Sequence, residues 1–255
     1  MRRFIRIRVI LIGVYVTNAG ISMIQFDDRA VAFIDVLGFK QLVNQAAVNA
    51  SDLSKLNDLV ALLGAVIPFL DGKVQRSVPQ HLIPLHLCIS DCIILSAPLQ
   101  VSFDQHKNYS GLEILVMRVI QVTQLLLDFG YLVRGGIEIG KVWHAESNII
   151  GPAYQEAYRL EQTAKMPWVI LSAAATRLWK SSGESAGSRM CIDYQGQCTV
   201  NSLHSYYIPE RFNGNISAAF SCYSAVVTQN LNAGLDPRCQ SKWQWMQQYL
   251  ADAKP

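Results

Sequence analysis

The sequence predicts a single α+β domain in which helices pack on one face of a β-sheet. Three observations favour this class. The chain has 255 residues, of which 51% are hydrophobic and 16% charged, so it can bury a sizeable core. Short apolar runs bounded by turn residues alternate with longer segments whose apolar residues recur at helical spacing. Because no internal repeat or linker marks a second domain, residues 23–255 are expected to form one unit.

The elements are expected in the order βαββαβ, with additions at the C-terminal end. The expected strands are 30–39, 85–89, 92–95, 131–143, 144–150 and 168–172, and the expected helices are 52–70, 111–129 and 152–165. The second helix is followed by Gly130, a usual stop signal, and Pro152 lies in the first turn of the third, where proline is tolerated. This order is typical of a ferredoxin-like split βαβ sheet with helices on one face.

The region beyond residue 172 carries weaker patterns. Residues 181–188 are rich in Ser and Gly and are expected to form a loop. Residues 191–206 are expected to form a hairpin that turns at Gln195-Gly196. Residues 220–231 and 243–250 are expected to be helical. These elements are treated as additions to the domain.

The first 22 residues have an ambiguous status. A basic start precedes an apolar run at residues 9–16, which resembles a short signal peptide but is too short to span a membrane. Met23 lies shortly before the first expected strand. We favour a start site assigned too early, ahead of an added strand or helix and of a targeting segment. Residues 1–22 are therefore treated as an N-terminal extension, and no stable membrane insertion is expected.

Charge and cysteine content exclude some classes of protein. A net charge of +3 is too small to indicate nucleic-acid binding. The six cysteines include no Cys-x-x-Cys pair, which argues against a zinc site or a disulfide framework. Cys88 and Cys92 lie in apolar strands and are expected to be small buried hydrophobic residues. His86 and His144 are isolated in the sequence and are expected to be structural.

Two aspartates occur in matching settings, each beside an apolar strand. Asp35 ends the strand that precedes Gly38, and Asp91 lies at the turn of the hairpin over 85–95. Burying a lone carboxylate costs several kcal/mol, and two carboxylates brought together need a cation between them or a proton on one of them. A divalent metal ion with bound phosphate oxygens would satisfy both groups.

Together with two later segments, these motifs resemble the class III nucleotidyl cyclase family. The motifs are Phe-Ile-Asp-Val-Leu-Gly-Phe (33–39), Ser-Asp (90–91) in a hairpin, Arg-Gly-Gly-Ile (134–137) and the helix 151–160 that contains Arg-Leu. The resemblance covers residues 30–172. Its details, including Ala-Tyr-x-Leu-Glu (157–161), are most similar to the pyrimidine cyclases of bacterial anti-phage (Pycsar) systems.

This resemblance implies two-metal catalysis on a nucleoside triphosphate. Asp35 and Asp91 would bind two divalent ions, Mn²⁺ or Mg²⁺, with the Val36 carbonyl as a further ligand. Gly38 would let the backbone approach the phosphates, and successive N–H groups from Val36 to Phe39 would bind them. The alternative for Phe39 is a plain core residue.

The resemblance also assigns roles to residues of the third and fourth motifs. Gln155 and Arg159 share a helix face and occupy the positions of the family's Asn and Arg, which orient the ribose and stabilise the transferring phosphorus. Leu87 and Asn148 stand where purine-specific members have Lys and Asp, and the Asn148 amide can both donate to and accept from a pyrimidine edge. Arg134 either contacts the triphosphate, lies in a dimer interface or is structural.

The predicted function is therefore a uridylate or cytidylate cyclase, with UTP favoured by resemblance. The family arrangement implies a homodimer in which one subunit supplies the metal acids and its neighbour supplies the Gln155 and Arg159 helix. The cyclic nucleotide would activate a separate effector in anti-phage defence, and the protein would be cytoplasmic, where triphosphates are found. The alternatives are a degenerate cyclase that only binds nucleotides, a purine cyclase and a diguanylate cyclase-like domain, whose Gly-Gly-Asp/Glu-Glu-Phe hairpin is missing.

Overall fold

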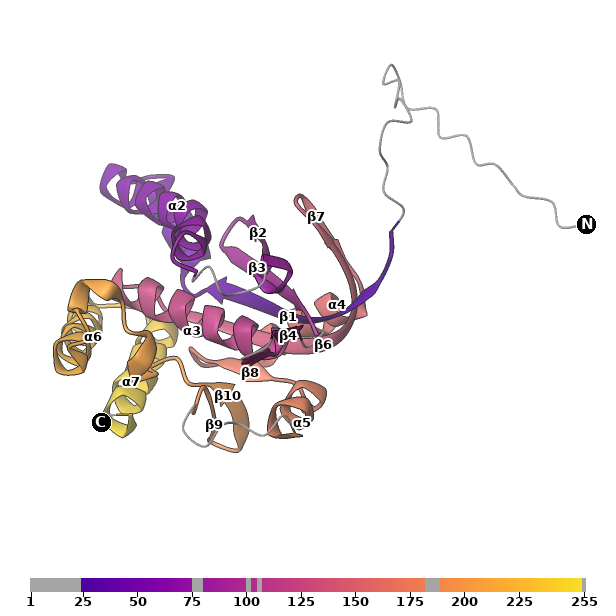
Figure 1. Ribbon diagram of the computed structural model, residues 1–255. Helices are drawn as coiled ribbons and strands as arrows, with labels where there is room; N and C mark the ends of the chain where they lie inside the picture. The colour runs from indigo at the N-terminus through magenta and orange to yellow at the C-terminus, as the bar shows by residue number, and fades with distance from the viewer. Residues whose placement is uncertain (1–23, 75–79, 100–101, 105–106, 182–188, 254–255) are drawn as a thin grey trace, which may run out of the picture.

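The computed structural model describes residues 24–74, 80–99, 102–104, 107–181 and 189–253 (Figure 1). The strands are β1 (Asp27–Val36), β2 (Leu85–Ile89), β3 (Cys92–Pro98), β4 (Ser102–Asp104), β5 (Lys107–Tyr109), β6 (Val133–Ala145), β7 (Asn148–Ile150), β8 (Val169–Leu171), β9 (Cys191–Tyr194) and β10 (Gln197–Val200). The helices are α1 (Phe39–Ala46), α2 (Ala50–Asp71), α3 (Gly111–Asp128), α4 (Pro152–Thr163), α5 (Ala173–Ser181), α6 (Ile216–Leu231) and α7 (Pro237–Asp252). Short 3₁₀ turns occur at η1 (Gln80–Leu82), η2 (Ser205–Tyr207) and η3 (Glu210–Phe212).

One mixed sheet organises the domain. Its strand order is β2-β3-β1-β6-β8-β10-β9, and β7 folds back onto the end of β6. Strand β1 lies at the centre of the N-terminal half, antiparallel to both β3 and β6, and β6 runs parallel to β8. The predicted α+β class and the βαββαβ order of β1, α2, β2, β3, α3 and β6 are confirmed.

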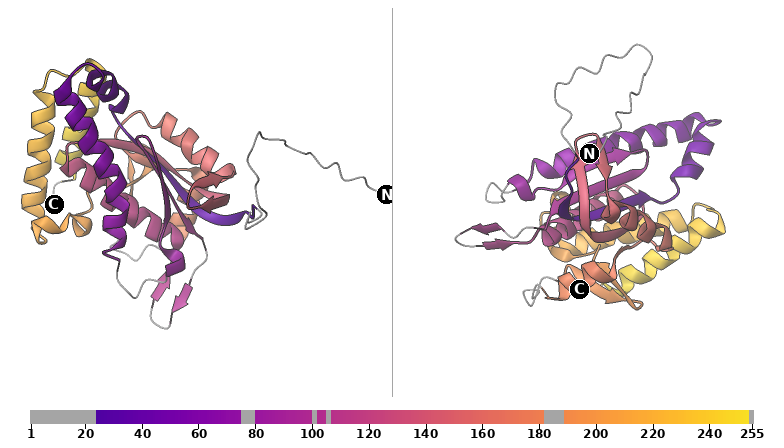
Figure 2. Two further views of the ribbon diagram at one scale, coloured as in Figure 1. Left: turned by 90° about the horizontal axis from the view of Figure 1, so that it is seen from above. Right: turned by 90° about the vertical axis from the view of Figure 1, so that its right-hand side faces the viewer.

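The two faces of the sheet carry different helices, as the views in Figure 2 show. Because side chains alternate along a strand, Ala30, Ala32 and Ile34 of β1 join the main core with α2 and α3. Val31 and Phe33 point to the opposite face and pack against α4. The expectation of helices on one face thus holds for the βαββαβ unit, whereas α4, which follows that unit, covers the other face.

The first strand ends earlier than predicted, because a helix that the sequence analysis missed begins there. Strand β1 stops at Val36, and α1 begins at Phe39 rather than continuing the strand. Gly38 separates the two with φ = 91°, a left-handed conformation that favours glycine. The spacing of Phe39, Leu42, Val43 and Ala46 is helical and would have revealed α1.

Other differences concern the C-terminal half and short elements. Helix α5 and the β4–β5 hairpin were not predicted, and α6 and α7 begin earlier than expected. The β9–β10 hairpin turns at Gln195 and Gly196, with φ of 50° and 78°, as the sequence predicts for a tight two-residue turn. Helices α6 and α7 form a second apolar cluster around Tyr223, Trp243 and Tyr249.

One helix of the described chain, α2, is long and apolar enough to cross a membrane by length and composition. Its most apolar window has a mean hydropathy of 1.6 and is 28% buried within the protein. Leu59, Leu63, Val66 and Ile67 of α2 contribute to the main core. The absence of membrane insertion stays a prediction. The predicted extension at residues 1–22 and Met23 lie outside the described residues.

Candidate active site

The two aspartates singled out in the sequence converge at one edge of the sheet. Asp35 lies at the end of β1, directly opposite Cys92 of β3. Asp91 follows Ser90, whose φ of 56° closes the tight turn between β2 and β3. The backbone N–H of Val36 donates to the Asp91 carbonyl at 3.2 Å, which fixes this turn against the end of β1. Ligand atoms of Asp35, Asp91 and Cys92 all lie within 4.8 Å of one another.

The electrostatics of this group favour a bound cation. Burial raises the pKa of the Asp35 carboxyl, and the nearby charge of Asp91 raises it further. Two carboxylates in such a place need a cation between them or a proton on one of them. The half-buried carboxyl oxygens are the hard ligands that Mg²⁺ and Mn²⁺ prefer, so the residues present fit a divalent metal ion.

A thiol completes the group, and the sequence analysis missed it. The Sγ atom of Cys92 lies 3.7 Å from Asp35 Oδ1 and 3.9 Å from Asp91 Oδ1. Burial, followed by the charges of both aspartates, raises the pKa of the Cys92 thiol well above its usual range, so it donates a proton to these carboxyls. The expectation of a buried hydrophobic residue was wrong for Cys88, which is exposed on the edge strand β2, whereas Cys92 is half-buried and packs against the apolar cluster on the α4 side of the sheet.

Arg134 bridges Asp35 to another acid, the buried Glu161. Arg134 is opposite Asp35 in the β1–β6 register, and its Nε donates to Asp35 Oδ2 at 3.3 Å. Its Nη2 lies 2.6 Å from Oε1 of Glu161 on α4, whose side chain is 3% exposed. Burial raises the pKa of Glu161 to about 7, against the opposing effect of Arg134. Within the chain, Arg134 therefore forms ion pairs with Asp35 and Glu161, and its predicted roles toward a triphosphate or a dimer interface stay predictions.

Glu161 reaches this site because α4 packs directly on β6. A Cβ atom at Gly136 would lie 2.4 Å from the Leu160 Cβ and 2.6 Å from the Ala157 carbonyl, so glycine permits this approach. Gly151, just before α4, lies against Val142 of β6, and Glu161 near the end of α4 lies against Arg134. Helix α4 therefore runs antiparallel to β6. Sequence analysis included Glu161 only as part of a family motif, and no local pattern assigned it to the site.

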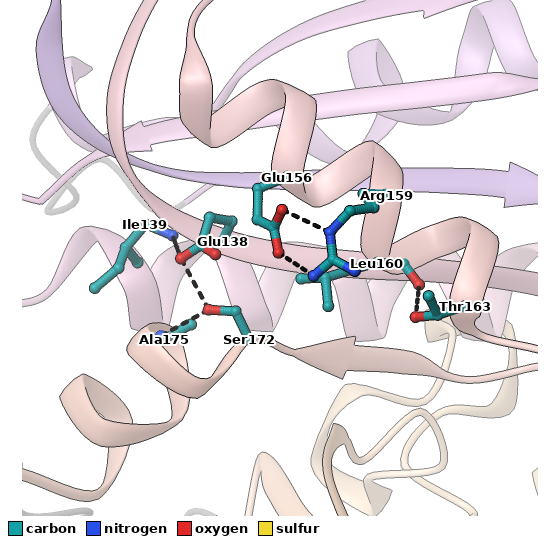
Figure 3. A network of polar contacts seen from close by, with 8 residues as sticks. All are labelled: Glu138, Ile139, Glu156, Arg159, Leu160, Thr163, Ser172 and Ala175. Carbon is teal, nitrogen blue, oxygen red and sulfur yellow. Dashed lines mark hydrogen bonds and ion pairs between the residues drawn. The ribbon is translucent and has the colours of Figure 1, made fainter.

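The two α4 residues predicted to act on the substrate lie on the outward face of the helix. Gln155 is exposed, and the Arg159 side chain is 61% exposed. Arg159 Nε donates to Glu156 at 2.8 Å, and Figure 3 shows the guanidinium turned toward that carboxylate. On the neighbouring strand, Glu138 accepts from the Ser172 hydroxyl at 2.8 Å. Within one chain, then, Arg159 pairs with Glu156 rather than with Asp35 or Asp91.

The predicted phosphate-binding backbone is shorter than expected. The N–H groups of Val36 and Leu37 are already used, because they donate to Asp91 and Leu132 carbonyls at 3.2 and 2.8 Å. Gly38 is exposed and caps α1, whose first N–H groups have no partner within the helix. Helix N-termini bind anions through such groups, so the available donors begin at Gly38 and not at Val36. Phe39 is partly buried against the main core.

Asn148, predicted to contact the base, is remote from Asp35 and Asp91 of its own chain. It is exposed and begins β7, opposite Ala145 at the far end of β6. Arg134, beside Asp35, and Ala145 are 11 positions apart on β6 (145 − 134), or roughly 36 Å along an extended strand. The β6–β7 hairpin projects from the body of the domain in Figure 1. Leu87, the other position considered, is half-buried against the α4-side cluster.

His144 has the structural role that the sequence predicts. Its Nδ1 lies 2.7 Å from the hydroxyl of buried Ser96, which also accepts from Arg29 Nε at 2.9 Å. Burial, followed by the charges of Arg29 and His86, lowers the pKa of His144 to about 4. The neutral imidazole therefore joins β3 to β6 away from Asp35 and Asp91.

The chain matches no family model, and no curated protein matches it. Several solved structures are similar to this chain, and they include adenylyl and guanylyl cyclases. The adenylyl cyclase CyaB from P. aeruginosa is 17% identical, with a TM-score of 0.45, over 69% of this chain and 93% of that chain. The monomeric guanylyl cyclase domain of the RhoGC fusion protein from the aquatic fungus Blastocladiella emersonii is 16% identical, with a TM-score of 0.46, over 69% and 95%. The guanylyl cyclase Cya2 is 15% identical, with a TM-score of 0.39, over 69% and 93%. At these identities and scores, the likeness does not by itself assign an activity.

Proposed function

We propose that the protein is a nucleotide cyclase that converts UTP or CTP to the 3′,5′-cyclic nucleotide and diphosphate. The observation that carries this proposal is the convergence of Asp35 and Asp91 beside the turn at Gly38. The four sequence motifs in cyclase order support it. UTP is the first candidate by resemblance to the commoner branch of the pyrimidine cyclases, since no residue placed here separates UTP from CTP.

The reaction needs a more acidic ribose hydroxyl and neutralised phosphate charge. Two divalent ions, Mn²⁺ or Mg²⁺, would supply both effects when bound. The carboxylates of Asp35 and Asp91 would hold these ions. The family resemblance adds the Val36 carbonyl as a further oxygen ligand. The free N–H groups at the start of α1, next to Gly38, would bind phosphate oxygens close to these acids.

The transition-state charge requires a cation that is free to contact the phosphate, and Arg134, the cation beside Asp35, is already paired with Asp35 and Glu161. Arg159 is exposed, and its ion-pair partner among the described residues is Glu156 on the same helix, so it can exchange that partner for a phosphate at low cost. We propose that Arg159 and Gln155 act in the site of a second copy, Gln155 orienting the ribose. A symmetric homodimer would then contain two composite sites, and Asn148 on its projecting hairpin would contact the base in the partner's site.

The pyrimidine assignment rests on the residues at the base-reading positions. Leu87 is apolar, so the lysine that purine-specific members use is missing. The amide of Asn148 both donates and accepts, and it suits the donor and acceptor edge of uracil or cytosine. The proposed product is a second messenger for an anti-phage effector, and the proposed location is the cytoplasm.

One observation favours a second candidate function. Gln155 replaces the Asn of the family motif, and the longer arm changes the ribose contact. A protein that binds a nucleotide without cyclising it would tolerate this change. The retention of Asp35, Asp91 and Arg159 favours catalysis instead.

A direct assay separates these functions. The full chain is incubated with each of UTP, CTP, ATP and GTP in the presence of Mn²⁺, and the products are identified by mass spectrometry. Cyclic UMP and diphosphate are expected from UTP, and Asp35→Ala and Asp91→Ala should each lower the rate at least about 100-fold by removing metal ligands. Asp58→Ala, which removes an exposed aspartate of α2, is the matched control and should keep full activity.

The possible results have distinct meanings. Cyclic AMP or cyclic GMP as the main product would contradict the pyrimidine assignment. Metal-dependent binding of UTP without any cyclic product would favour the binding module. Turnover by Asp35→Ala at the wild-type rate would exclude the proposed metal centre.

A further inference from the structure

The metal-binding acids have a resident cation in the same chain. Arg134 lies between Asp35 and Glu161, with its Nε 3.3 Å from the Asp35 Oδ2 and its Nη2 2.6 Å from the Glu161 Oε1. A guanidinium paired with Asp35 occupies a carboxylate oxygen that a divalent ion would also use. Metal binding at Asp35 therefore has to compete with Arg134.

The two contacts of Arg134 are unequal. The distance to Glu161 is shorter by 0.7 Å (3.3 − 2.6), and the Glu161 side chain is 3% exposed against 18% for Asp35. Charged pairs interact more strongly at short distance and in a drier environment. The Asp35 contact has hydrogen-bond geometry, whereas the Glu161 contact is a close ion pair in which Glu161 Oε1 accepts no hydrogen bond. Because the Asp35 contact is longer and more exposed, we take it as the one that yields to a metal ion.

The position of Glu161 is fixed by packing rather than by its own side chain. Leu160 and Ala157 sit on Gly136, so the last turns of α4 have little freedom to shift along β6. The Arg134 side chain is 28% exposed and reaches the acids on a flexible stem. Any adjustment on metal binding therefore falls on Arg134, while Glu161 stays in place.

We infer that Glu161 is a positioning residue for metal binding: its buried carboxyl group retains the Arg134 guanidinium when a metal ion displaces it from Asp35. This inference rests on the proposed function, because it takes Asp35 and Asp91 as the metal ligands. Helix α4 would then have two functions, because its outward face carries Gln155 and Arg159 and its β6-facing side carries Glu161. Each α4 would then serve the metal centre of its own chain through Glu161.

Three variants separate positioning from a plain effect of charge. Glu161→Gln removes the charge and keeps the shape, so Arg134 is left with Asp35 as its charged partner. Glu161→Asp keeps the charge but shortens the side chain by one methylene, so the carboxylate withdraws from Arg134. The double variant Arg134→Gln/Glu161→Gln removes both the Glu161 carboxylate and the Arg134 cation that competes with the metal ion. Glu210→Gln, at an exposed glutamate on η3, is the matched control for removing one negative charge.

The test is a Mn²⁺ titration of the full chain followed by the electron paramagnetic resonance signal of free Mn²⁺, without nucleotide. Glu161→Gln and Glu161→Asp should each raise the Kd for Mn²⁺ about tenfold, which corresponds to about 1.4 kcal/mol. The double variant should return to within about threefold of wild type, and Glu210→Gln should stay within about twofold. Circular dichroism of each variant verifies that it is folded.

Two results would overturn the inference while leaving the proposed function intact. One is wild-type affinity in both Glu161→Gln and Glu161→Asp. The other is a double variant that binds Mn²⁺ no better than Glu161→Gln, because Arg134 would then not be the competitor. If wild type binds no Mn²⁺, or Asp35→Ala binds it equally well, the proposed metal centre fails and the inference fails with it.

Discussion

Gly136→Ala tests the contact that places α4 on the sheet. An added Cβ would lie 2.4 Å from the Leu160 Cβ, 2.6 Å from the Ala157 carbonyl oxygen and 3.1 Å from the Glu161 nitrogen. Two of these three atoms belong to the helix backbone, which cannot move aside as a flexible side chain can. The substitution therefore forces α4 away from β6 along its C-terminal turns.

The expected cost follows from overpacking. Inserting a methyl group into a well-packed contact typically costs about 1–3 kcal/mol, and the closeness of backbone atoms places Gly136→Ala at the upper end of that range. Each kcal/mol lowers the midpoint of thermal unfolding by about 2–4 °C in a protein of this size. We expect Gly136→Ala to lower Tm by roughly 5–10 °C, and to weaken Mn²⁺ binding because Glu161 moves from Arg134.

Gly64→Ala is the matched control, with the same chemical change and the opposite expected sign. Gly64 lies inside α2, and an added Cβ there meets nothing within 4 Å. Alanine is favoured over glycine in a helix interior by about 1 kcal/mol, so Gly64→Ala should be slightly more stable than wild type. Urea and thermal unfolding of both variants give the comparison. Equal stabilities of Gly136→Ala and wild type would refute the packing of α4 on β6.

Three other predictions concern assembly, pH and the N-terminal segment. Mixing inactive Asp35→Ala with inactive Arg159→Ala should restore activity to about a quarter of all sites if half the dimers are mixed, and no recovery after subunit exchange would exclude a composite site. The pKa of His144 is lowered from 6.5 to about 4 in the folded chain. Between these two pH values the imidazole is protonated in the unfolded chain and neutral in the folded chain, which favours unfolding. Wild type should therefore lose up to about 3 kcal/mol relative to His144→Gln as the pH falls from 7 to 4, and parallel unfolding curves for the two proteins would contradict this. A chain that begins at Met23 should be as soluble and as active in the cyclase assay as the full chain, and loss of either property would show that residues 1–22 belong to the fold.

The sequence by itself determined the parts of this protein that depend on neighbouring residues. Apolar alternation and helical spacing predicted β1, α2, α3 and α4, and turn residues predicted the β9–β10 hairpin. Asp35 and Asp91 were identifiable because a carboxylate beside a buried strand needs a partner, whatever the rest of the fold. Helix α1 was missed although its pattern is local, since the strand was extended to Phe39 across the Gly38 turn.

Tertiary structure alone decided which distant residues join the site. Strand pairing set Cys92 and Arg134 on either side of Asp35, and the β1–β3 and β1–β6 registers fix that order. Glu161 depends on the contact of α4 with Gly136, 25 positions earlier in the chain (161 − 136). Such contacts form only when whole elements pack, because they are set by shape and burial across the core and not by the spacing of residues within one element.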